Sequence, residues 1–120
     1  ENFSTIGSIR VSQCPLFYKK IDALVFPSLL ECFSASPIES MKMGTLVFAS
    51  DYPFISEVCD DAIFYFNALD ASSIASSIAS GLSDPTKIKE KKLKGLEKTK
   101  NMPTALDRTQ SYLKIINEIL

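Results

Sequence analysis

Residues 22–49 read DALVFPSLLECFSASPIESMKMGTLVFA, and this stretch decides the fold. It contains two continuous apolar quartets, at residues 23–26 and 46–49, and a third quartet follows at residues 63–66. Strands that are buried on both faces of a parallel sheet are uninterruptedly apolar in this way. The segments between the quartets are too long for hairpin turns and long enough for one crossover helix each. The sequence therefore predicts an α/β fold with a mostly parallel sheet flanked by helices.

Local signals add a weaker strand and the first helix. Phe3–Ile6 is the weaker strand candidate. Ser36, Pro37 and Glu39 match a capping box, with Ser at the N-cap, Pro at the first helical position and Glu at the third. Gly44 suits the left-handed cap at the end of that helix.

Three more helices are predicted in the second half of the chain. Asp70 can cap a helix whose apolar stripe, at four-residue spacing, consists of Ile74, Ile78 and Leu82. Asp84 precedes a lysine-rich helix, and Pro103 precedes a terminal helix at residues 104–120.

Length and composition limit the class of protein. The 120 residues correspond to one domain or part of one, and 46% hydrophobic with 22% charged residues is ordinary for a globular chain. Three widely spaced cysteines and the lack of histidine exclude a disulfide framework, a Cys2His2 zinc site and a histidine-activated nucleophile within this chain. The sequence shows no signal peptide and no membrane-spanning run, which predicts a cytoplasmic protein.

Charge is segregated along the chain. Residues 21–84 contain most of the Asp and Glu side chains and Lys42 as their one base, whereas residues 85–120 are rich in lysine. Phosphate backbones require clustered Lys and Arg, so the acidic middle argues against nucleic-acid binding.

Two segments follow predicted strands at their carboxyl ends, where open α/β sheets bind ligands: residues 27–39 and residues 50–57. The first segment leads into a helix N-terminus, which favours an anion such as phosphate. Glu31 and Glu39 lie in the same segment and would repel phosphate, so we expect them to accept hydrogen bonds from the hydroxyls of a sugar or a ribose. The residues alone thus predict a ligand that combines phosphate with hydroxyl groups.

The run from Asp22 to Met41 resembles the signature of glycosyltransferase family 4, D-x4-P-S-x2-E-G-F-G-x4-E-A-M followed by a glycine. The resemblance implies the GT-B fold and covers the second half of its C-terminal, Rossmann-like nucleotide-sugar domain, so that residues 1–120 would form one partial domain. This sequence departs from the pattern at Cys32 and Ser34, where glycine is usual, and at Leu46, where proline is usual.

The same resemblance implies a role for each site residue. Glu31 would be the catalytic carboxylate that contacts hydroxyls of the donor sugar, and Glu39 would hold the ribose. Phe33, Ser34 and Ala35 would present backbone N–H groups to the sugar and the diphosphate. The implied reaction is retaining transfer of a hexose from a nucleoside diphosphate sugar to a glycan or lipid-linked acceptor, without a metal or cofactor. An acceptor domain would be required in addition, so the isolated chain is expected to be inactive.

Purely structural interpretations stay open beside these roles. Glu39 can be the capping partner of Ser36 alone, and Glu31 can be a solvated loop residue. Asp51 and Glu57 can cap a helix around residues 54–59. The lysine run can be a solvated helix face, or it can bring the protein to the anionic inner surface of a membrane.

Two alternative functions also remain: a non-catalytic nucleotide-binding or interaction module, and part of a nucleotide-sugar epimerase. The resemblance further implies the strand order 3-2-1-4-5-6, of which this chain holds only strands 3 to 6. We therefore expect residues 3–6 to pair beside residues 23–26, or the exposed sheet edge to form a homodimer.

Overall fold

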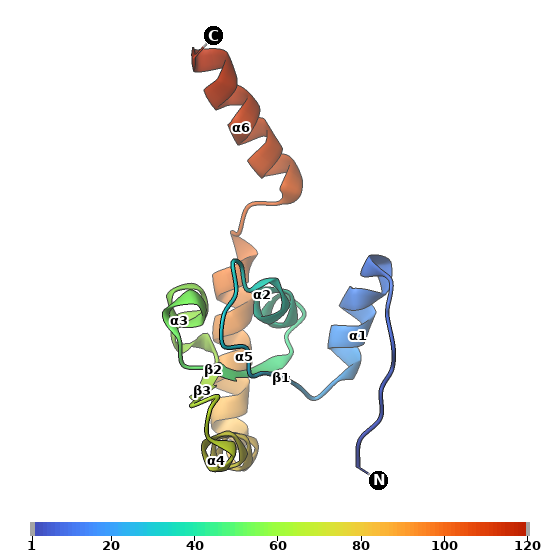
Figure 1. Cartoon of the computed structure of the whole chain (residues 1–120). Helices are drawn as coiled ribbons and strands as arrows, with labels where there is room; N and C mark the ends of the chain where they lie inside the picture. Colours follow the sequence, from blue (N-terminus) through green and yellow to red (C-terminus); the bar gives the residue numbers. More distant parts are fainter. Residues whose placement is uncertain (1, 120) are drawn as a thin grey trace.

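The computed structural model describes residues 2–119, which form a small α/β body with one projecting helix (Figure 1). Along the chain its elements are η1 (Val11–Gln13), α1 (Cys14–Lys20), β1 (Ala23–Phe26), α2 (Ala35–Lys42), β2 (Leu46–Ser50), α3 (Pro53–Cys59), η2 (Asp60–Ala62), β3 (Phe64–Phe66), α4 (Ala71–Leu82), α5 (Pro85–Lys100) and α6 (Ala105–Ile119). None of the described helices is long and apolar enough to cross a membrane.

The sheet has three parallel strands in the order β1-β2-β3, which confirms the predicted fold class. Every residue of β2 is buried, because β1 and β3 pair with its two edges and helices cover its two faces. In this register Phe48 of β2 lies beside Phe64 of β3, and their rings stack with centroids 5.0 Å apart. Aromatic pairs of this kind stabilise neighbouring strands beyond the area that they bury.

Alternate residues of β2 face two different parts of the core. Val47 and Ala49 belong to a cluster with residues of α2 and α3, whose buried members are Met41, Val47, Ala49, Ile55, Cys59, Ala62 and Ile63. Leu46 and Phe48 form a second cluster with Phe66, against which residues of α4 and α5 pack. Figure 1 shows the corresponding layers, with α2 and α3 on one side of the sheet and α4 on the other.

The predicted cap at Asp70 is confirmed, and Asp84, predicted to precede the lysine-rich helix, caps that helix as well. The side chain of Asp70 accepts a hydrogen bond from the Ser72 N–H at 2.9 Å, at the start of α4. The side chain of Asp84 accepts from the Thr86 and Lys87 N–H groups at 3.1 and 3.0 Å, at the start of α5. These bonds satisfy backbone donors that have no partner within the first turn of a helix.

The start of α2 differs from the prediction, although its end does not. The helix begins at Ala35, so Ser34 is the N-cap and the predicted capping box of Ser36 and Glu39 does not form. The Ser34 hydroxyl is buried and donates to the Phe54 carbonyl of α3 at 3.4 Å, and this tertiary contact replaces a local cap. Gly44 has φ +74° and ends the helix as expected.

Two further expectations are wrong. Residues 3–6 are exposed and form no strand, and among the described residues β1 pairs with β2 alone. Phe3 and Ile6 are both exposed and Ser4 and Thr5 between them are polar, so the segment buries no apolar face that would hold it at the edge of the sheet. The expected pairing with residues 23–26 is therefore absent, whereas homodimerisation stays a prediction.

The N-cap of α3 is Tyr52, so neither Asp51 nor Glu57 caps that helix.

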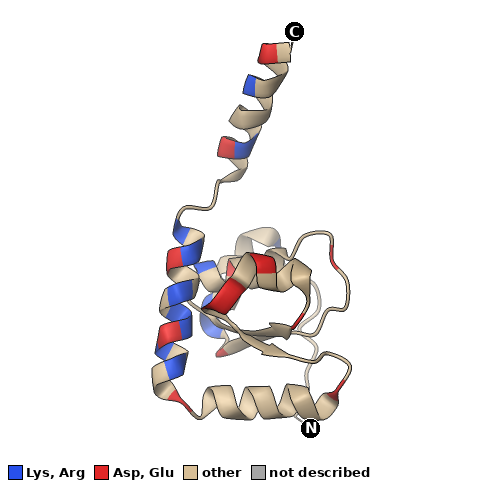
Figure 2. Cartoon of the chain, turned by 90° about the vertical axis from the view of Figure 1, so that its left-hand side faces the viewer, with Lys and Arg blue, Asp and Glu red and all other residues tan. Residues whose placement is uncertain are grey.

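The lysine-rich helix is α5, and several of its lysines bind the acidic turn η2. The Lys94 ammonium lies 2.5 Å from the Asp61 carboxylate and 2.6 Å from Glu90, and Lys98 lies 3.4 Å from Asp60. The hydrogen bond from Lys94 lowers the pKa of Asp61, so this link exists above the acidic range and weakens as the pH falls through that pKa. Figure 2 shows the mixed charges of α5 beside the uncharged α4.

The apolar contact of α4 differs in one position from the predicted stripe. Ile74 and Ile78 pack against the second core cluster, but Leu82 is 48% exposed. The close approach occurs at the buried Gly81, where a Cβ atom would lie 2.6 and 2.9 Å from two carbons of the Phe48 ring. Only glycine lets α4 pack this tightly on the sheet.

We therefore predict that Gly81→Ala destabilises the chain by about 1–3 kcal/mol, because the added methyl group overpacks the buried Phe48 ring. The measurement is thermal or urea denaturation followed by circular dichroism. Ser80→Ala, at the exposed neighbouring position, is the matched control and should melt near the wild type. A Gly81→Ala variant as stable as the control would contradict this packing.

Candidate functional site

Glu31 lies in the loop that follows β1, and a chain of serine hydroxyls connects it to the sheet. The Ser28 hydroxyl donates to Glu31 Oε1 at 2.7 Å, and the buried Ser50 hydroxyl at the end of β2 donates to the Ser28 carbonyl at 2.7 Å. The carboxylate of Glu31 is thus held at the carboxyl ends of β1 and β2. A carboxylate accepts several hydrogen bonds, so this one can also accept from the hydroxyls of a ligand.

The three residues predicted to offer backbone N–H groups lie at the start of α2 in different environments. Phe33 is 60% exposed, whereas Ser34 is buried at 1% exposure. The Ala35 N–H already donates to the Phe33 carbonyl at 2.9 Å. The turn that precedes α2 therefore presents an aromatic ring to solvent and has one of its three N–H groups occupied.

A hollow of about 530 Å³ lies beside α2, and we call it the α2 hollow. It brings together three of the predicted site residues, Phe33, Ala35 and Glu39, whereas Glu31 and Ser34 do not line it. The remaining lining residues are Ile38, Lys42, Val58, Met102, Pro103 and Arg108. Sequence reasoning missed Lys42 and Arg108, and Arg108 gives no local signal because it comes from the distant helix α6.

Glu39 lines the α2 hollow and also a smaller hollow of about 280 Å³ between α1 and α2. Tyr18 of α1 lines the smaller hollow, and its side chain neighbours both Ser36 and Glu39. Burial raises the pKa of Tyr18, and the negative charge of Glu39 acts in the same direction. The Tyr18 hydroxyl therefore stays protonated and can act as a hydrogen-bond donor beside the Glu39 carboxylate.

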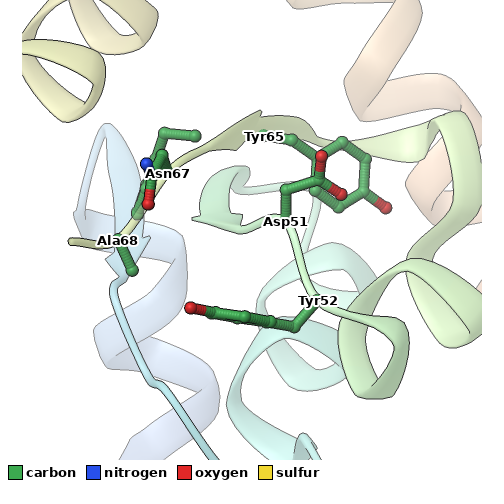
Figure 3. A pocket seen from close by; sticks show the side chains of 6 residues that line it. Asp51, Tyr52, Tyr65, Asn67 and Ala68 are labelled. Carbon is green, nitrogen blue, oxygen red and sulfur yellow. The ribbon is translucent and has the colours of Figure 1, made fainter. Parts of the chain in front are cut away.

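A third hollow, of about 320 Å³, opens at the carboxyl ends of β2 and β3, and we call it the strand-end pocket (Figure 3). Its lining residues are Asp51, Tyr52, Tyr65, Phe66, Asn67 and Ala68. Asp51 and Tyr52 belong to the predicted ligand-binding segment 50–57, whereas Tyr65 and Phe66 were predicted only as part of a strand and residues 67–68 were given no role. The same rule of strand carboxyl ends applies to β3 and could have found them.

The chain resembles known glycosyltransferases in sequence and in structure. The family model described as glycosyl transferases group 1 matches residues 1–101. The O-antigen chain mannosyltransferase RfbU of Salmonella typhimurium is 37% identical over 73 residues, which are 61% of this chain and 21% of that protein. Sucrose-phosphate synthase from Thermosynechococcus elongatus superposes with a TM-score of 0.80 at 24% identity, over 94% of this chain and 30% of that one, and therefore shares its fold.

The cysteines provide a test of this geometry. Cys32 is exposed in the loop beside Glu31, whereas Cys59 is buried and desolvation raises the pKa of its thiol to about 11. We predict that iodoacetamide at pH 8 alkylates Cys32 at the rate of an ordinary exposed thiol and modifies Cys59 only after unfolding. Peptide mass spectrometry gives both rates, and equal rates in the native chain would show that the core is packed differently.

Proposed function

This chain belongs to the glycosyl transferases group 1, and we propose that it is the donor-binding part of a retaining glycosyltransferase of family 4, corresponding to the second half of the C-terminal domain. The donor is a nucleoside diphosphate hexose, and neither a metal nor a cofactor takes part. The acceptor is a glycan or a lipid-linked saccharide, and the protein works in the cytoplasm. The chain spans about a fifth of the length of RfbU. We therefore propose that an acceptor domain outside these 120 residues completes the enzyme.

The observation that carries the proposal is the composition of the α2 hollow. Lys42 and Arg108 supply positive charge for a diphosphate, and the N-terminal end of α2 favours an anion in the same region. Glu39 supplies a carboxylate that accepts hydrogen bonds from the two ribose hydroxyls. The exposed ring of Phe33 offers an aromatic face to the base or the sugar.

Glu31 takes the role of the residue that contacts the donor sugar. The hydrogen bonds from Ser28 to Glu31 and from Ser50 to Ser28 keep the carboxylate in place before the ligand arrives. A carboxylate that is already oriented loses little entropy when it accepts bonds from sugar hydroxyls. It also lies near the positive charge that develops on the sugar ring as the donor bond breaks.

The lysine-rich helix α5 gives only weak support to contact with a membrane surface. Lys94 and Lys98 bind the acidic turn η2, and Lys91 donates to the Asp61 carbonyl at 2.7 Å. Because these three lysines bind groups of η2, they stabilise the packing of α5 and are not free to attract anionic lipids. Peripheral contact with the inner membrane surface would depend on other lysines of the run.

We predict that Glu39→Gln weakens binding of a nucleoside diphosphate by about 1–2 kcal/mol, or five- to thirty-fold, since a neutral amide loses charge-assisted bonds to the ribose. Because no capping box involves Glu39, both Glu39→Gln and Glu39→Ala should melt close to the wild type. The measurements are calorimetric titration with UDP and GDP and melting curves, on the complete enzyme. Glu57→Gln, on the exposed side of α3, is the matched control.

Glu31→Gln separates the sugar role from the nucleotide role. This variant should bind the bare nucleotide like the wild type and should lose affinity only for the nucleotide sugar. If Glu39→Gln binds nucleotide as well as the Glu57→Gln control does, the ribose role of Glu39 is wrong.

The isolated chain should not transfer sugar. The proposed reaction takes place between a donor domain and an acceptor domain, and this chain supplies only the former. Incubation with UDP- and GDP-hexoses and an oligosaccharide acceptor should release no nucleotide above background. Retaining turnover by the 120-residue chain alone would refute the proposal that a separate acceptor domain is required.

A further inference from the structure

The strand-end pocket shares no lining residue with the α2 hollow, and it has the features of a built site. Two neighbouring strand ends supply its walls, with Asp51 and Tyr52 following β2 and residues 65–68 ending β3. In Figure 3 the ring of Tyr52 forms one side of the opening, and Asn67 and Ala68 lie on the opposite side. Its volume of about 320 Å³ is at the lower end of the range for small-molecule sites, about 300–1,000 Å³, which suits a single ring.

Hydrogen bonds hold the Asn67 amide and the backbone that carries Asp51. Asn67 Oδ1 accepts a hydrogen bond from the Leu69 N–H at 3.1 Å, so the amide of Asn67 has its NH₂ group to offer as a donor. The Asp51 N–H donates to the Phe66 carbonyl at 2.9 Å, which holds the loop after β2 against the end of β3. The exposed carboxylate of Asp51 is an acceptor.

The aromatic side of the pocket is also preformed. The ring of Tyr52 stacks on that of Phe54 at 5.8 Å and 9°, so its plane is fixed by α3. The ring of Tyr65 lines the pocket, while its hydroxyl donates to the Asp60 carbonyl at 2.5 Å. The pocket thus combines a flat aromatic face with the Asn67 amide as a donor, the Asp51 carboxylate as an acceptor and the Tyr52 hydroxyl, which can be either.

Charge distinguishes this pocket from the α2 hollow. Asp51 is its one charged residue, and none of its lining residues in the described chain is Lys or Arg, whereas Lys42 and Arg108 line the α2 hollow. A diphosphate is repelled by the strand-end pocket, while a neutral ligand with hydroxyl groups is not. We propose that the strand-end pocket binds a neutral pyranose ring, stacked on Tyr52 and hydrogen-bonded by Asp51 and Asn67.

The location of the pocket connects it to the donor site. Ser50, which precedes Asp51, binds the Ser28 carbonyl, and Ser28 binds Glu31. The bound pyranose ring can therefore be part of the acceptor saccharide or the sugar of the donor. Only the choice between these two substrates rests on the proposed function. The two sources share the same chemistry and differ in whether a nucleotide is attached.

The test is a titration of the ¹⁵N-labelled 120-residue chain followed by two-dimensional NMR, with separate arms for methyl α-mannoside, mannobiose, GDP and GDP-mannose. The free saccharides should shift the amide signals of Asp51, Tyr52, Asn67 and Ala68 in a saturable way, and GDP should leave them unchanged. Shifts at these positions with the free saccharides assign the ring to the acceptor, and shifts with GDP-mannose alone assign it to the donor.

Variants make the test specific to the pocket. Asn67→Ala and Tyr52→Ala should each weaken saccharide binding by about five-fold or more, whereas Tyr52→Phe should retain it because the ring face remains. Asn101→Ala removes an exposed amide at the end of α5 and is the matched control. The proposal is overturned if no sugar probe shifts these signals, if Asn67→Ala binds like Asn101→Ala, or if the shifts fall on residues 31–35 instead.

If the donor-binding proposal were wrong, the pattern of NMR shifts would differ from the pattern that overturns the sugar site. In that case GDP would produce no shifts around Glu39, while the free saccharides would still shift the signals of the strand-end pocket.

Discussion

The burial of β2 on all sides is the constraint on which the rest of the structure depends. All five of its residues are buried, because β1 and β3 satisfy its backbone and the two core clusters cover its faces. Parallel pairing on both edges requires crossover helices, and these helices close the core. The same pairing brings the carboxyl ends of the three strands to one edge, and the strand-end pocket opens there. The α2 hollow is lined instead by helices and the segments that flank them.

The sequence was sufficient for the parts of the fold that local chemistry determines. The three apolar quartets became β1, β2 and β3, and Asp70 and Asp84 cap the helices that they precede. The sequence was insufficient where a contact between distant residues determines where a helix or strand begins. The Phe54 carbonyl binds Ser34 and moves the start of α2 ahead of the Ser36 pattern, and Phe3–Ile6 lacks a neighbour with which to form a strand.

The candidate site was predictable to a similar extent. The signature spacing located Glu31 and Glu39, but it contains no information about which side chains from other elements share their hollows. Arg108 approaches Glu39 through α6, and Asn67 meets Tyr52 only because β3 lies beside β2. These partners are 69 and 15 residues apart along the chain. The packing of α6 brings the first pair to one hollow, and the register of the sheet brings the second pair to one pocket.

The stacking of Tyr52 on Phe54 has a consequence for spectroscopy. The chain contains four tyrosines and no tryptophan, so tyrosine dominates its intrinsic ultraviolet emission. Two of the four, Tyr52 and Tyr65, line the strand-end pocket, and the Tyr65 hydroxyl is bonded to a backbone carbonyl. Half of the chain's tyrosines therefore line one cavity, so we expect a ligand bound there to change the tyrosine emission without any attached label.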